Sequence, residues 1–120
     1  MNMAIVLSDV LRLILEDACE DYHGLYEIIW ALNTSHPDVG EDSKRQVAQQ
    51  ALSNLVKRGW VMLYSTAWPP RNFTPLSEDQ FEAVINAPSS WGTSTNPPAV
   101  SYWFASTPAG EEAYRSRALR

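Results

Sequence analysis

The sequence predicts an α+β fold, and three observations carry this prediction. A helical pattern over residues 43–58 ends at Gly59 and passes directly into a strand pattern over residues 60–66. A second strand pattern, residues 100–106, leads into the turn at 107–110 and a short final helix. The 120 residues suffice for one domain with one core, and 45% hydrophobic with 19% charged content is typical of a globular chain.

Two further helices are predicted before these elements. Ser8 is expected to cap the first, which runs to about Asp21, and Gly24 marks the break before the second. The first helix has the apolar stripe Leu7, Val10, Leu11, Ile14, Leu15 and Ala18, and the second has Leu25, Ile28, Ile29 and Leu32. The second helix is expected to end at Asn33.

The third helix is expected to be capped by Asp42 or Ser43 and to bury a stripe of aliphatic residues. This stripe comprises Val47, Ala48, Ala51, Leu52 and Leu55. Lys57 and Arg58 suit the negative end of the helix dipole, and Gly59 suits the left-handed position that follows a helix.

The two predicted strands would pair antiparallel, but about thirty residues separate them, which is too long for a tight hairpin. Ser77 and Gln80 form a capping-box pattern, and Phe81, Val84 and Ile85 supply an apolar stripe. A short helix is therefore predicted inside this connection. The final helix is expected to be capped by Thr107, with Pro108 at its first position.

The tryptophans are expected to serve packing. Trp30 and Trp60 are predicted to lie in or beside the core. Trp68, Trp91 and Trp103 lie in or next to the long connection, where they are expected to pack an irregular segment onto the sheet. A peptide or small-ligand pocket built from these aromatic residues is the alternative.

The net charge of −5 is distributed unevenly along the chain. Residues 1–42 hold nine acidic residues and one arginine, whereas residues 43–71 hold five basic residues and no acidic one. An acidic protein can still bind nucleic acid if its positive charge gathers on one face. A solvated helix surface that happens to be basic is the alternative interpretation.

Two segments resemble winged-helix DNA-binding regulators of the PadR-like and MarR-like types. ALSNLVKRGWVMLY is similar to their passage from recognition helix into wing, and FASTPAGEEAY to their second wing strand and the following helix. The resemblance implies a winged helix-turn-helix whose two-stranded wing is interrupted by the inserted helix. A single domain, 1–120, would then comprise an N-terminal helix (1–23), a helix-turn-helix with the first wing strand (24–66), an insertion (67–99), and the second wing strand with the C-terminal helix (100–120).

The resemblance also implies double-stranded DNA as the partner and transcriptional regulation as the function. The implied contacts are Ser43, Lys44, Arg45, Gln46, Gln49 and Gln50 on the third helix and Arg71 in the wing. Lysine and arginine would neutralise phosphates, and glutamine can hydrogen-bond adenine. Such regulators bind as symmetric dimers, so a homodimer is expected through the strip from Met3 through Leu7 and Leu11.

Other features favour a second function, an acidic winged-helix module that binds protein and does not bind DNA. Glu41 and Asp42 come just before the third helix and would repel phosphate, and the wing offers only Arg71. Glu20 and Asp21 lie near the C-terminal end of the first helix, where the dipole disfavours negative charge. A basic protein partner would relieve that repulsion.

No catalytic motif, cofactor loop or zinc spacing is present in the sequence, so an enzyme is not predicted. Glu16, Asp17, Glu20 and Asp21 cluster near His23, but a solvated acidic face explains them better than a metal site. Cys19 is the only cysteine, which fits a reducing cytoplasm. The sequence also lacks an apolar run long enough for a membrane span and a recognisable signal peptide.

Overall fold

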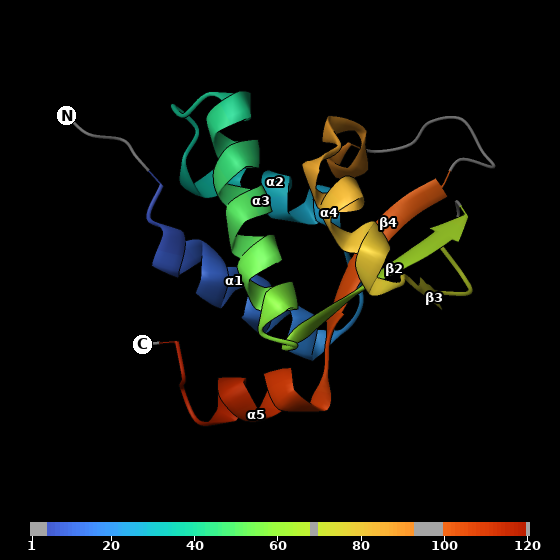
Figure 1. The fold of residues 1–120 in the computed structure, drawn as a ribbon. Coiled ribbons are helices and arrows are strands. Elements are labelled where there is room, and N and C mark those ends of the chain that lie inside the picture. The colour runs from blue at the N-terminus through green and yellow to red at the C-terminus, as the bar shows by residue number, and fades with distance from the viewer. Residues whose placement is uncertain (1–4, 68–69, 93–99, 120) are drawn as a thin grey trace.

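A computed structural model describes residues 5–67, 70–92 and 100–119. Helices and a small antiparallel sheet make up this part of the chain, so the α+β class is confirmed (Figure 1). The elements are α1 (Leu7–Glu20), β1 (His23–Gly24), α2 (Leu25–Ser35), α3 (Glu41–Lys57), β2 (Val61–Ala67), β3 (Thr74–Pro75), α4 (Glu78–Asn86), the 3₁₀ helix η1 (Pro88–Trp91), β4 (Val100–Ser106) and α5 (Pro108–Arg115). Among the described residues, no helix is long and apolar enough to cross a membrane.

The sheet has the strand order β1-β4-β2-β3, with antiparallel pairing throughout. The long ladder joins β2 to β4 from Val61 opposite Ser106 to Ala67 opposite Val100, which confirms the predicted pairing of these strands. Because side chains alternate between the faces of a strand, Leu63 and Phe104 lie opposite each other on one face. The neighbouring pair, Tyr64 and Trp103, lies on the other face.

The core lies between the Leu63–Phe104 face of the sheet and the helices. Leu63 and Phe104 are fully buried together with apolar residues from α1, α2 and α3. These include Val10, Ile14, Leu15, Leu25, Ile28, Leu52 and Leu55. The predicted inserted helix is present as α4, where Gln80 Oε1 accepts from the Ser77 backbone N–H at 2.9 Å. Its residue Ile85 is buried, so α4 closes one side of the same core.

The predicted N-caps of α1 and α3 are wrong. Val6 occupies the cap position of α1 and Gly40 that of α3, each with an extended backbone and without a side-chain cap bond. Ser8, Asp42 and Ser43 therefore lie inside the first turns of these helices. Both helices therefore begin without a capping side chain.

The strip predicted to form a dimer is largely buried in the core of the domain itself. Leu11 is only 8% exposed and belongs to the core, and Leu7 is half-buried against it. Met3 lies outside the described residues. The homodimer stays a prediction, with little apolar surface left on α1 to support it.

Helix α3 ends in a two-bond turn of the Schellman type. The N–H of Trp60 donates to the Leu55 carbonyl at 3.1 Å, and the N–H of Gly59 donates to the Val56 carbonyl at 3.0 Å. Gly59 has φ of 74°, which confirms the predicted left-handed position. This conformation favours glycine because it lacks a Cβ atom.

The residues that follow α3 are bound to the residues that precede α5. Thr107 Oγ1 donates to the Gly59 carbonyl at 2.6 Å and accepts from the Gly110 N–H at 3.0 Å, which confirms the predicted Thr107 cap. The Thr107 N–H donates to the Trp60 carbonyl at 3.0 Å. We call these contacts the Gly59–Thr107 junction.

Gly110 tests how tightly the junction is packed. A Cβ atom at this position would lie 1.9 Å from the Trp60 carbonyl oxygen, so the backbone would have to move. Gly110→Ala should therefore lower the free energy of unfolding by about 2 kcal/mol or more in urea denaturation. Gly92→Ala is the control, because its Cβ would meet nothing within 4 Å, and it should cost about 0.5 kcal/mol or less. Equal losses in the two variants would contradict the close approach.

Candidate functional site

The structure places the predicted DNA-contacting residues in different environments. Ser43, Gln46 and Gln50 are exposed on α3, and Arg71 is exposed between β2 and β3. Arg45 and Gln49 are half-buried, and Lys44 is buried. The predicted set therefore does not form one exposed basic face.

Lys44 connects two helices. Its side chain is 4% exposed, and its Nζ donates to Asn33 Oδ1 at 2.9 Å near the C-terminal end of α2. The negative end of the α2 dipole favours an ammonium group there. Lys44 lies four residues before Ala48, on the same buried stripe of α3. This spacing in the sequence could have indicated that Lys44 is buried. This burial argues against a phosphate contact by Lys44.

Acidic side chains lie beside the remaining cations of α3. Arg45 Nη2 is 3.0 Å from Asp42, and Lys57 Nζ is 3.6 Å from Glu82 of α4. The inserted helix thus brings negative charge to the exposed side of α3. With Glu41 at the first position of α3, the acids around this surface balance or exceed the bases. Such a surface attracts a polyanion weakly.

A different constellation appears on the sheet face that points away from the core. Aromatic rings from α2, β2, β4 and the segments before β1 and β3 meet there. We call this set the aromatic face: Tyr22, Tyr26, Trp30, Tyr64, Phe73 and Trp103. Its members are far apart in sequence, and the β2–β4 register brings Tyr64 and Trp103 opposite each other.

The rings of the aromatic face form a continuous row. Along one arm, centroid distances are 4.7 Å from Trp30 to Tyr26, 5.9 Å from Tyr26 to Trp103 and 5.5 Å from Trp103 to Phe73. Phe73 stacks on Tyr22 at 4.2 Å, and Tyr22 meets Tyr64 edge-on at 5.0 Å. Edge-on and stacked contacts of this kind hold aromatic rings in fixed orientations.

Two rings of the row, Trp30 and Tyr22, are open to solvent. Trp30 is 56% exposed and Tyr22 is 39% exposed, whereas Trp103 between them is buried by its neighbours. Burial raises the pKa of Tyr26 and Tyr64 above the ordinary value of 10.0, so both phenols are neutral near pH 7. The row therefore presents an aromatic surface that is partly exposed to solvent and on which the Tyr26 and Tyr64 side chains are uncharged.

Carboxylates flank this row. Glu27 Oε2 accepts from the Gly24 N–H at 2.6 Å, and its Oε1 lies 3.3 Å from His23 Nδ1. The charge of Glu27 adds to the burial that raises the pKa of Tyr26. Exposed Asp21 accepts from the Tyr22 N–H at 2.7 Å. The acid predicted to attract a basic partner thus lies next to the aromatic face.

The predictions for the tryptophans have mixed outcomes. Trp30 is exposed, so its expected place in or beside the core is wrong, whereas Trp60 packs half-buried against the core. Trp91 is buried and donates from Nε1 to the Ile85 carbonyl at 2.8 Å, as expected for a packing residue. Trp103 joins the aromatic face, and Trp68 lies outside the described residues.

The acidic cluster on α1 shows one perturbed carboxyl. Burial raises the pKa of Asp17 above its ordinary value of 3.8, and the neighbouring acids Glu20, Glu16 and Glu27 raise it further, while His23 acts in the opposite direction. Within residues 5–67, 70–92 and 100–119, no three potential ligands converge to hold a metal ion. The carboxylates of the cluster repel one another.

Comparison with protein-family models, with curated proteins and with solved structures finds no match. The geometry of the chain is therefore the basis for its proposed function.

Asp17 should make stability depend on pH. Its pKa is higher in the folded than in the unfolded chain, so the folded state binds the proton more tightly. Its contribution to stability is present below pH 3.8 and is lost as the pH rises through the folded-state value. Asp17→Asn should raise the urea midpoint at pH 7 and lose this advantage at pH 3. Asp38→Asn, at an exposed loop acid, is the control. Stabilisation of the same size at both pH values would exclude this origin.

Proposed function

We propose that this chain is a winged-helix domain that binds a basic protein segment through its aromatic face. The element order α2, α3, β2 and β4, with α4 inserted between the strands, supports the winged-helix part of the proposal. The aromatic face carries the functional part. Large half-exposed aromatic surfaces occur preferentially where proteins dock.

The chemistry of the aromatic face selects a cationic partner. Trp30 and Tyr22 offer exposed ring surfaces, on which arginine and lysine bind through the ring quadrupole. Asp21 and Glu27 add carboxylates that can form ion pairs with the same cations. Single-stranded nucleic acid also stacks on aromatic rows, but its sites combine them with a positively charged groove, which these acids oppose.

DNA regulation is the alternative, and the exposed Ser43, Gln46 and Gln50 on α3 favour it. The charge balance of α3 weighs against this alternative. Lys44 is buried, Arg45 lies beside Asp42, and Lys57 lies beside Glu82. A regulator that reads duplex DNA needs phosphate-neutralising contacts before base contacts can specify a sequence.

Peptide binding tests the main proposal. A peptide of alternating arginine and serine should quench or shift tryptophan fluorescence at low salt, and a glutamate–serine peptide of equal length should not. Trp30→Ala should weaken binding by about fivefold or more, because it removes an exposed ring without opening the core. Trp60→Phe is the control, since Trp60 packs against the core beneath Arg58. Equal affinity for both peptides would refute the proposal.

A salt series with random duplex DNA separates the two functions. The protein-binding proposal predicts no strong, salt-sensitive association even at low ionic strength. The regulator alternative predicts affinity that falls steeply with salt, weakens in Arg45→Ala and changes sequence preference in Gln46→Ala. If the wild type shows this salt-sensitive DNA binding and does not bind the arginine–serine peptide, DNA is the partner.

A further inference from the structure

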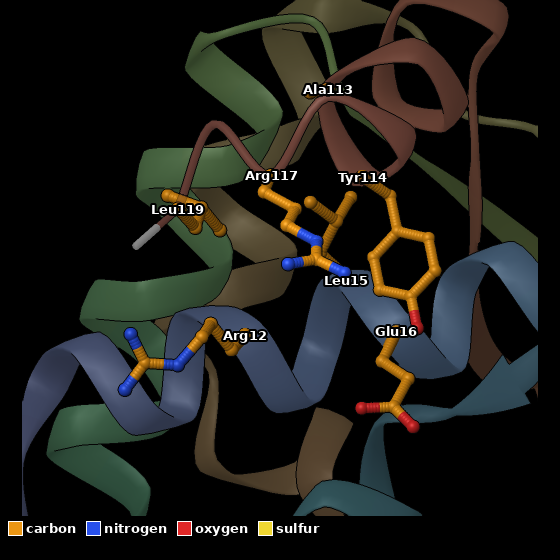
Figure 2. Close-up of a pocket in the computed structure, with 7 residues that line it drawn as sticks. All are labelled: Arg12, Leu15, Glu16, Ala113, Tyr114, Arg117 and Leu119. Atoms are coloured by element: carbon orange, nitrogen blue, oxygen red, sulfur yellow. The ribbon is translucent and has the colours of Figure 1, made fainter.

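A small pocket lies between α1 and the turn that follows α5. Its volume is about 230 Å³. Leu15 and Leu119 line it with aliphatic carbon, and the ring of Tyr114 forms one side. Arg12, Glu16 and Arg117 bring charged groups to it, and Figure 2 shows the Arg117 side chain reaching between Leu119 and Tyr114 toward α1.

The backbone at Arg117 is unusual. Helix α5 ends in a Schellman turn, in which the Ala118 N–H donates to the Ala113 carbonyl at 3.0 Å and the Arg117 N–H donates to the Tyr114 carbonyl at 3.1 Å. Arg117 occupies the left-handed position of this turn, with φ of 57°. The chain uses Gly59 at the equivalent position after α3. A side chain in this conformation is strained, so glycine would be the more stable choice at 117.

The arginine at this strained position supplies a guanidinium at the pocket. Arg12 is already paired with Asp9, and Arg115 is paired with Glu112 at 2.8 Å. Among the described residues, the Arg117 side chain has no hydrogen bond or ion pair. An exposed cation beside aliphatic carbon is the arrangement that recognises an amphipathic anion.

We infer that the pocket between α1 and α5 binds a small aliphatic carboxylate, with its carboxylate on Arg117 and its hydrocarbon chain against Leu15 and Leu119. The volume lies below the roughly 300–1,000 Å³ of pockets for drug-sized ligands, so a chain of a few carbons fits its scale. Glu16 lies at the same pocket and opposes an anion, so it limits the affinity. This inference is independent of the proposed function, because the aromatic face shares no residue with the pocket.

Calorimetric titration with acetate, butanoate and hexanoate tests the inference. Affinity should rise about three- to fourfold per added methylene group until the pocket is filled, because each group buries apolar surface. Hexanol and hexylamine test the charge requirement, since each has six carbons, as hexanoate does, but lacks the carboxylate. Both should bind at least tenfold more weakly than hexanoate.

Arg117→Gly is the most informative variant. It should reduce hexanoate affinity by about tenfold or more, while the melting temperature stays unchanged or rises by up to about 5 °C. Arg115→Ala, at the last residue of α5, is the matched control, and its hexanoate affinity should equal that of the wild type. Glu16→Gln should tighten hexanoate binding, because it removes the opposing charge.

Three results would each overturn the inference. The first is the absence of measurable hexanoate binding by the wild type at tens of millimolar ligand. The second is equal affinity for hexanol and hexanoate, which would make the pocket merely apolar. The third is an Arg117→Gly variant that keeps its fold, as judged by circular dichroism, and also keeps its affinity for hexanoate.

Discussion

The Gly59–Thr107 junction is the constraint on which the rest of the structure depends. The Thr107 hydroxyl joins residues 48 positions apart when it donates to the Gly59 carbonyl. Because this contact lies at the end of the β2–β4 ladder, it sets the pairing of Val61 with Ser106 and every pair beyond it. A slip of one residue would exchange the two faces of a strand. The Leu63–Phe104 pair in the core and the Tyr64–Trp103 pair on the aromatic face thus follow from one register.

The same junction also connects the two candidate surfaces. On one side of it, the β2–β4 register places Trp103 between Tyr26 and Phe73 and so completes the aromatic face. On the other side, the Gly110 backbone rests on the Trp60 carbonyl and directs α5 along α1, where its last turn forms the pocket. Each surface therefore takes part of its residues from helices or strands that the junction positions.

Local signals in the sequence predicted much of the fold. The strand Val100–Ser106, the helix α4 with its Ser77 cap and the left-handed Gly59 follow from residue types at short spacing. The two-residue strands β1 and β3 lack enough residues to show a period. The aromatic face was missed because its rings come from separate elements, and the sequence does not show which of them share a face. Likewise, the ion pair between Lys57 and Glu82 exists only once α4 packs on α3.

The central claim is that the aromatic face is the binding surface. A ¹H–¹⁵N correlation spectrum tests it most directly, because the indole N–H groups of the five tryptophans give separate signals. During titration with the arginine–serine peptide, the signals of Trp30 and Trp103 should move, because both indoles belong to the aromatic face. Those of Trp60 and Trp91 should stay in place, because these side chains pack against the core. Movement confined to Trp60 and Trp91 would contradict the account.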